Sequence, residues 1–136
     1  MSLESTIKYT NKAVLTPEAL SRLFQASGIK RPYDDLPRIQ RMIDCADITY
    51  TAWASDQLVG VARAITDFSY CCYLSDLAVD KDYQKQGIGK NLVSLLQDQL
   101  GDQVALILLS APNAMEYYPQ LGFNTIQNGF IIPRKK

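Results

Sequence analysis

Residues 70–101 constrain the fold of this chain more than any other stretch of its sequence. Tyr70 to Val79 is apolar and aromatic with few breaks, which predicts a strand that is covered on both faces. Asp80 ends this run, and a short polar loop with two glycines follows it. A helix is then predicted up to Gly101, which stands where a C-cap glycine belongs. Its apolar residues recur at helical spacing: Ile88, Leu92, Leu95, Leu96 and Leu100.

The loop between this strand and this helix has the features of an anion-binding site. The first amides of a helix lack internal partners and lie at the positive end of the helix dipole. Gly87 and Gly89 let the backbone come close to a ligand, and Lys85 and Lys90 add positive charge. Such a junction suits a phosphate or pyrophosphate group. Two glycines alone fit equally well a strand-to-helix turn that binds nothing.

Length and charge limit the function classes. The chain has 136 residues, which predicts one domain over residues 1–136 with a sizeable core. Lys+Arg and Asp+Glu both number 14, and the only basic run is at the C-terminus, so nucleic acid is not expected as a partner. No apolar run approaches the ~20 residues that span a bilayer, and the N-terminus lacks the apolar centre of a signal peptide. We therefore expect no membrane partner and a cytoplasmic protein.

The cysteines and the absence of histidine limit the chemistry further. The chain contains Cys45, Cys71 and Cys72, and no histidine. These cysteines lack the spacing of metal ligands, so we predict no metal site and expect all three to be buried in a reducing compartment. Without histidine, the usual Ser–His and Cys–His nucleophile pairs are excluded. Any chemistry must then use carboxylates, tyrosines, backbone amides or a bound cofactor.

The rest of the chain predicts alternating helices and strands, hence an α/β or α+β domain with a mixed sheet. After a first strand, one helix is predicted to start with Thr16 as its N-cap and Pro17 at its first position, and a second from about Asp35. The other predicted strands are Ile7–Tyr9, Ile48–Ala54, Leu58–Thr66, a buried Val104–Leu109, and a terminal pair at Asn124–Ile126 and Phe130–Ile132. A last short helix is predicted over Ala114–Leu121. A right-handed parallel crossover should connect the strand at Tyr70 to the strand at Val104.

Two motifs in this order resemble the GNAT superfamily of acyl-CoA N-acyltransferases. Gln84 to Gly89 fits the Gln/Arg-x-x-Gly-x-Gly/Ala signature of that family, and Leu77 to Val79 is similar to its cofactor strand. Tyr117 to Phe123 resembles the family's aromatic-Tyr-x-x-x-Gly-Phe segment, at the expected separation. The resemblance covers about the whole chain. It implies a mostly antiparallel mixed sheet with flanking helices, in which two central parallel strands splay apart.

The resemblance also implies how acetyl-CoA would bind. The pantetheine arm would lie between the splayed strands and pair with the main chain of Leu77, Ala78 and Val79. The pyrophosphate would lie on the loop, in agreement with the helix-terminus argument above. Its contacts would come from Gln84, Lys85, Gln86, Gly87, Ile88, Gly89 and Lys90. Asn113 resembles a polar residue that often contacts the cofactor, although it stands closer to Tyr118 than in many members.

The family chemistry implies direct transfer of the acetyl group to a primary amine in a ternary complex. Tyr118 matches the tyrosine that donates a proton to the leaving thiolate, while its neighbour Tyr117 is expected in the core. No general base is assigned. Asp76 is the acid nearest the cofactor strand, but a structural hydrogen-bonding or ion-pairing role is the stronger interpretation of it. Asp67 is a weaker candidate.

The acceptor amine is not identified by the sequence. By resemblance, the connection between the first two helices would line the acceptor side, which points to Arg31, Tyr33 and Asp34, with Trp53 as a wall. A non-catalytic acyl-CoA sensor or interaction module is the main alternative. A Rossmann-like nucleotide site lacks the third glycine and the later acid, and an acyl-enzyme on Cys71 or Cys72 lacks an activating histidine. The short C-terminal strands permit a homodimer.

Overall fold

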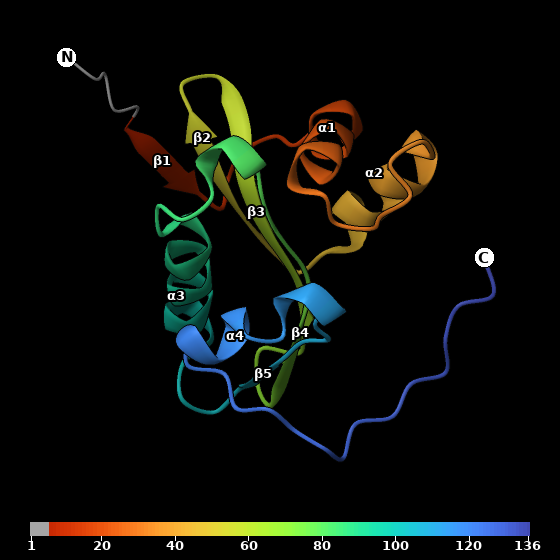
Figure 1. The fold of residues 1–136 in the computed structure, drawn as a ribbon, viewed down its shortest axis with the longest axis vertical. Helices are drawn as coiled ribbons and strands as arrows, with labels where there is room; N and C mark the ends of the chain where they lie inside the picture. Colours follow the sequence, from red (N-terminus) through yellow and green to blue (C-terminus); the bar gives the residue numbers. More distant parts are fainter. Residues whose placement is uncertain (1–5) are drawn as a thin grey trace.

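The computed structural model describes residues 6–136 as one mixed sheet with helices on both faces (Figure 1). The strand order is β1-β2-β3-β4-β5, and β4–β5 is the parallel pair among antiparallel neighbours. The strands are β1 (Ile7–Thr10), β2 (Ile48–Ala54), β3 (Gln57–Thr66), β4 (Cys71–Val79) and β5 (Ala105–Ile107). The helices are α1 (Pro17–Ser27), α2 (Leu36–Cys45), α3 (Ile88–Leu100) and α4 (Tyr117–Gln120), with short 3-10 turns at Lys81–Tyr83 and Pro112–Ala114.

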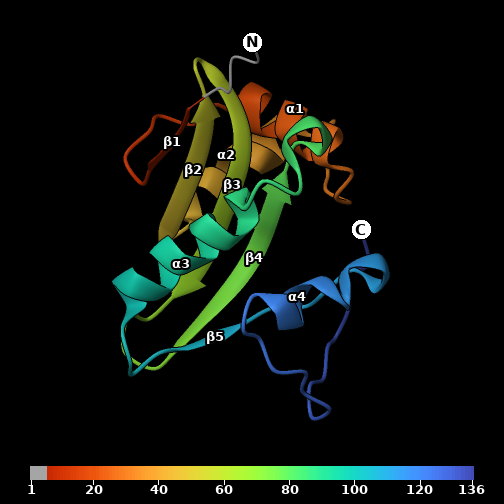
Figure 2. The ribbon, with the colours of Figure 1, turned by 60° about the vertical axis from the view of Figure 1, so that its left-hand side comes forward.

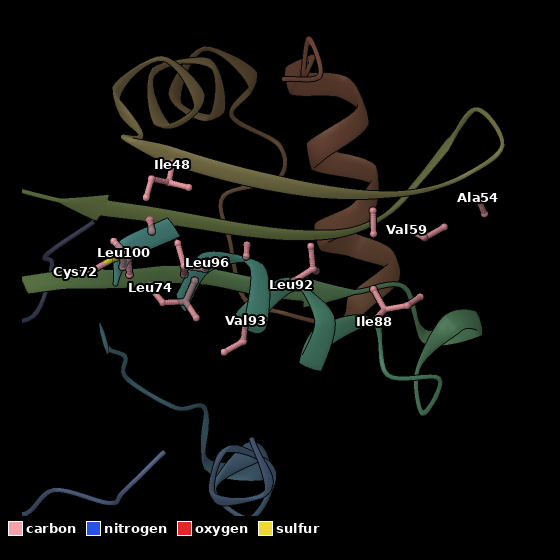
Figure 3. Close-up of a cluster of buried hydrophobic side chains, with 13 residues drawn as sticks. Ile48, Ala54, Val59, Cys72, Leu74, Ile88, Leu92, Val93, Leu96 and Leu100 are labelled. Carbon is pink, nitrogen blue, oxygen red and sulfur yellow. The ribbon is translucent and has the colours of Figure 1, made fainter. Parts of the chain in front are cut away.

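Two apolar clusters hold helices to opposite faces of the sheet. On one face, Ile88, Leu92 and Leu96 of α3 are buried against β2, β3 and β4, as Figure 3 shows. On the other face, α1 and α2 pack through a separate cluster that includes Phe24 and Ile39. The mixed α/β fold expected from the sequence is therefore confirmed. Of residues 6–136, no helix is long and apolar enough to cross a membrane.

The predicted starts of α1 and α2 are confirmed by their capping geometry. The Thr16 hydroxyl accepts the Ala19 amide at the start of α1, and Gly28 ends that helix with a left-handed φ of 81°. Asp35 caps α2 in the same way through the Arg38 amide. Gly101 follows α3 as expected, and Val93, which the helical pattern missed, is buried with its stripe.

The prediction that β4 is covered on both faces was wrong, because its residues alternate between buried and partly exposed. In β3, Arg63 pairs with Asp76, and the next residue, Ala64, pairs with Leu74. Ser75 has no partner in β3, so it forms a β-bulge in β4. Leu74 therefore packs in the α3 cluster, whereas Asp76 points to the α1 face together with Arg63. The bulge therefore moves Asp76 from the face of α3 to the face of α1 and α2, where Arg63 and Arg31 pair with it.

The predictions for the C-terminal third were also partly wrong. β5 is three residues long instead of a buried run over Val104–Leu109, and Ile107 and Leu109 are exposed. The helix predicted over Ala114–Leu121 divides into a 3-10 turn and α4. Asn124–Ile126 and Phe130–Ile132 form no strands. Figures 1 and 2 show this segment leaving α4 as an extended arm that runs clear of the sheet.

The cysteines are not all buried, contrary to expectation. Cys72 lies in the core, whereas Cys45 and Cys71 are exposed, and all three thiols are free. Burial raises the pKa of the Cys72 thiol, which disfavours a reactive thiolate there. Cys71 lies beside it on the opposite face of β4, as the alternation of a strand requires.

Candidate functional site

The centre of the candidate site is a length of β4 whose main chain, among the described residues 6–136, has no strand beside it on the β5 side. β5 pairs with Cys71, Cys72 and Tyr73 and then diverges (Figure 2). From Leu74 to Val79, β4 is paired with β3 but not with β5. Leu77, Ala78 and Val79 therefore lie where the two parallel strands have separated, as the resemblance implied. The free strand edge offers backbone donors and acceptors to an extended ligand.

A buried carboxylate fixes the turn that follows this strand. The Asp80 side chain accepts the Asp82 amide at 2.9 Å and pairs with Arg22 of α1 at 2.9 Å. The Arg22 guanidinium also donates to the Leu58 carbonyl of β3. Asp80 thus joins α1, β3 and the 3-10 turn at one point, which sets where the loop to α3 begins. The sequence analysis had assigned Asp80 only to the end of the strand.

The loop then presents a row of backbone amides without partners. Within residues 6–136, no hydrogen bond uses the amides of residues 85–90. Lys85 and Gly87 both have left-handed backbone, with φ of 66° and 83°, and a Cβ on Gly87 would meet no atom within 4 Å. The loop is therefore an open cradle at the positive end of α3, and its shape and polarity fit a diphosphate. Gln84 donates its side-chain amide to the Val79 carbonyl at 2.9 Å, which ties the loop to the end of β4.

Gly89 is the point where α4 reaches this helix end. A Cβ on Gly89 would collide with the Tyr117 hydroxyl and would lie 3.8 Å from Val79. Glycine is therefore required here for close approach, since its φ is ordinary. Tyr117 is 38% exposed, so it is not the core residue that the sequence predicted. Its position puts α4 directly beside the cradle.

Tyr118 lies next to Tyr117 in an aromatic group. Its ring makes edge contacts with Tyr117 and Phe123, with ring centres 5.3 and 5.7 Å apart. Burial raises the pKa of the Tyr118 hydroxyl, the nearby Tyr117 raises it further, and the charge of Arg31 opposes this in part. The hydroxyl therefore stays protonated at neutral pH and can donate a proton. Tyr118 therefore lies within electrostatic range of Arg31, which belongs to the connection between α1 and α2.

The bulge in β4 is held by a buried network of two arginines and one carboxylate. Asp76 is fully buried and accepts from Arg31 Nε and Arg63 Nε at 2.5 Å each. Arg31 also donates to the Ser75 carbonyl at 2.7 Å, and Arg63 donates to the Ser75 hydroxyl at 2.9 Å. Both Asp76 oxygens are occupied and none of its surface is exposed, so the geometry supports the structural interpretation of Asp76. The lone Arg63 in an apolar strand was the signal in the sequence that could have identified its partner.

The remaining residues predicted for the acceptor side are not brought together. Arg31 joins Asp76 in the network, whereas the Trp53 indole donates to Thr51 and its ring packs against the α1 cluster. Tyr33 lies instead in a separate open pocket of about 380 Å³ against α1. That pocket is lined by Glu18, Ser21, Arg22, Gln25, Tyr33, Asp34 and Leu36. Asn113 is exposed on the 3-10 turn before α4.

Asp67 has a structural role at the other end of β4. Its carboxylate accepts the amides of Ser69, Tyr70 and Cys71, and these hydrogen bonds lower its pKa. It therefore shapes the β3–β4 turn, far along the strand from Val79. No group of three or more His, Cys, Asp or Glu side chains in the described part of the chain could hold a metal ion.

Comparison with known proteins agrees with this geometry. Residues 16–131 match the family model described as "Acetyltransferase (GNAT) domain". An uncharacterized N-acetyltransferase, ycf52, from Gracilaria tenuistipitata var. liui is 30% identical over 117 residues, covering 81% of this chain and 63% of that protein. The chain spans less than two thirds of the length of the curated relatives it matches.

Solved structures share the fold at low sequence identity. A probable acetyltransferase from methicillin-resistant Staphylococcus aureus superposes with a TM-score of 0.80 at 23% identity, covering 95% of this chain and all of that one. An aminoglycoside N-acetyltransferase in complex with CoA superposes with a TM-score of 0.68 at 18% identity, covering 96% of this chain and 95% of that one.

Proposed function

Because the chain belongs to the GNAT acetyltransferase family, we propose that it moves the acetyl group of acetyl-CoA directly to a primary amine. The observation that supports this proposal most strongly is that two stretches of backbone without hydrogen-bond partners follow one another directly. The β4 edge is free from Leu74 to Val79, and it leads into the free amides of residues 85–90. One extended molecule with a diphosphate at one end fits both surfaces at once.

The residues present fit acetyl-CoA, which would supply an activated thioester. The main chain of Leu77, Ala78 and Val79 would pair with the amide groups of the pantetheine arm. The diphosphate would accept from the amides of the cradle, and Lys85 and Lys90 would add charge at its exposed side. In this arrangement Gln84 acts mainly through its hold on Val79, because its side-chain amide is already engaged. Asn113, exposed before α4, would contact the ligand from the opposite side.

We assign the proton donor for the departing thiolate to Tyr118. Its raised pKa keeps the hydroxyl protonated, and its position beside Tyr117 puts it near the start of α3. A donor held close to a thiolate contributes by proton transfer and by orientation. Asp76 takes no part in proton transfer, because both its oxygens are bound to arginines. The amine would lose its proton to water, directly or after attack.

The acceptor side is proposed to lie along the connection from α1 to α2. Arg31 belongs to this connection, and its side chain is 25% exposed. Its three guanidinium nitrogens already donate to Asp76, the Ser75 carbonyl and the Lys30 carbonyl, so it would act on an acceptor through its charge and by shaping the connection. Tyr33 lines the neighbouring pocket, where the two acids Glu18 and Asp34 outnumber the one cation, Arg22, and their charge would favour a cationic amine. The chemical class of that amine is left to experiment.

Acetyl transfer over a panel of amines tests the proposal, with release of the CoA thiol as the readout. The panel should contain polyamines, amino sugars, amino acids and protein amines. Turnover with one class would support the enzyme and identify its acceptor. Tight acetyl-CoA binding with no turnover across the panel would favour a non-catalytic acyl-CoA module. Failure to bind acetyl-CoA would contradict both.

A further inference from the structure

The segment that carries Tyr118 is attached to the rest of the molecule by packing alone. α4 has four residues and no side-chain cap at its start. Among the described residues 6–136, every hydrogen bond made by residues 110–123 stays within that segment. Leu121 and Phe123 pack against the apolar cluster of α3, which fixes one end of the segment. Hydrogen bonds therefore do not determine where Tyr118 lies relative to the cradle of residues 85–90.

Tyr117 provides a second attachment, at the first turn of α3. Gly89 is buried there, and a Cβ in its place would collide with the Tyr117 hydroxyl and lie 3.4 Å from Cζ of the same ring. The other atom near that Cβ would be Val79 Cγ2 at 3.8 Å, an ordinary contact. The φ of Gly89 is not left-handed, and alanine forms helices better than glycine does. What glycine provides at this position is therefore space for the Tyr117 ring.

Both attachments touch Tyr118. Its ring meets the rings of Tyr117 and Phe123 edge-on, with ring centres 5.3 and 5.7 Å away. Because packed rings leave little free space, a shift of one ring moves its neighbour. Displacement of Tyr117 from Gly89 would therefore displace Tyr118 as well.

We propose that the contact between Tyr117 and Gly89 sets the spacing between the cradle and the Tyr118 hydroxyl, which makes Tyr117 and Gly89 positioning residues. This role rests on the proposed acetyl transfer. Gly89 contributes one of the free amides of the cradle, so the contact links the residue beside the diphosphate to the neighbour of the proton donor. A ligand held at both places needs a fixed spacing between them, since a misplacement of about 1 Å can cost about 100-fold in rate.

Two substitutions and their combination test the contact, with kcat measured by release of the CoA thiol and the acetyl-CoA Kd by calorimetry. Gly89→Ala keeps the backbone amide, so the Kd should change by less than about threefold, whereas kcat should fall by about tenfold or more. Tyr117→Phe removes only the hydroxyl and should lower kcat by less than about fivefold. Gly89→Ala/Tyr117→Phe should be as fast as Tyr117→Phe alone, because the added Cβ then meets the ring no closer than Cζ, at 3.4 Å. Ser94→Ala, at an exposed position of α3, controls for helix propensity and should keep the wild-type kcat.

A lower kcat with an unchanged Kd and full binding stoichiometry is a result that a merely structural role would not give, because loss of folded enzyme would remove binding sites as well. A double variant as slow as Gly89→Ala, or Gly89→Ala with the wild-type kcat, would overturn the proposal. Tyr117→Phe as slow as Tyr118→Phe would also overturn it, since Tyr117 would then be the proton donor itself.

Spectra of the ligand-free protein test the contact without any turnover. In the ¹H–¹⁵N spectrum, Gly89→Ala should shift the amides of Tyr118 and Phe123, and the double variant should return them towards their positions in Tyr117→Phe. If Gly89→Ala leaves both amides unmoved, the contact does not position Tyr118, whatever the turnover. A wild-type chain that acetylates no amine of the panel would instead contradict the proposed function, and these shifts would still decide whether Gly89 and Tyr117 fix the place of Tyr118.

Discussion

Removal of the charge on Asp76 should destabilise the protein more than any other single charge change in the described chain. Asp76→Asn keeps the shape of the side chain but leaves Arg63, whose side chain is 6% exposed, without its counter-charge. Breaking a buried ion pair in this way costs about 3–5 kcal/mol, because the remaining charge stays in the interior. We expect the lower end of this range, since Arg63 keeps the Ser75 hydroxyl and the Met42 carbonyl as acceptors.

Urea unfolding followed by Trp53 fluorescence would measure this loss as a lower midpoint with an unchanged slope. The matched comparison is Arg22→Met, which should cost less than Asp76→Asn because Arg22 is 48% exposed and the Asp80 carboxylate that remains keeps the Asp82 amide as a donor. A triple variant, Arg31→Met/Arg63→Met/Asp76→Leu, should recover much of the loss because it removes the stranded charge. If Asp76→Asn costs no more than Arg22→Met, the buried network does not hold the β4 bulge as argued.

Three further predictions address the proposed activity. Tyr118→Phe should lower kcat by about 100-fold with little change in acetyl-CoA affinity, and a normal rate in this variant would remove Tyr118 from the mechanism. Because the pKa of Tyr118 is raised, the rate of the wild-type enzyme should fall only above pH ~10. Gly87→Val forces a branched residue into left-handed backbone, at a cost of about 1–3 kcal/mol. Calorimetry should therefore show acetyl-CoA binding that is at least roughly tenfold weaker, and unchanged affinity would exclude the amides of residues 85–90 as the binding site of the diphosphate. Acetyl-CoA should raise the Tm while NAD and ATP should not, and greater stabilisation by NAD would count against the assignment.

Local rules explain why so much of the fold could be predicted from the sequence. Thr16, Asp35 and Gly101 start or end a helix through contacts within the nearest turn of backbone. These helix boundaries can therefore be predicted without knowledge of the tertiary structure. The same holds for the strand at Ile48–Ala54, whose predicted bounds match β2. The motif from Gln84 to Gly89 is local as well, and it forms the turn that the glycines predicted.

The errors concern features that depend on distant parts of the chain. The bulge at Ser75 follows from Arg31 and Arg63, which are 44 and 12 residues away, so a periodicity within β4 could not show it. The short β5 and the unpaired arm after Phe123 depend on what lies beside the sheet edge. An apolar run such as Val104–Leu109 indicates that the segment is stabilised by burial, but it does not show which part of the structure would bury it.

The central claim is that one ligand lies along the free edge of β4 and ends on the amides before α3. A titration with acetyl-CoA, followed by ¹H–¹⁵N chemical shifts, would test it residue by residue. The account predicts the largest shifts at the amides of Leu77 to Val79 and of residues 85–90, with α2 unaffected. Saturating acetyl-CoA that leaves those amides unchanged and shifts another part of the chain would contradict it.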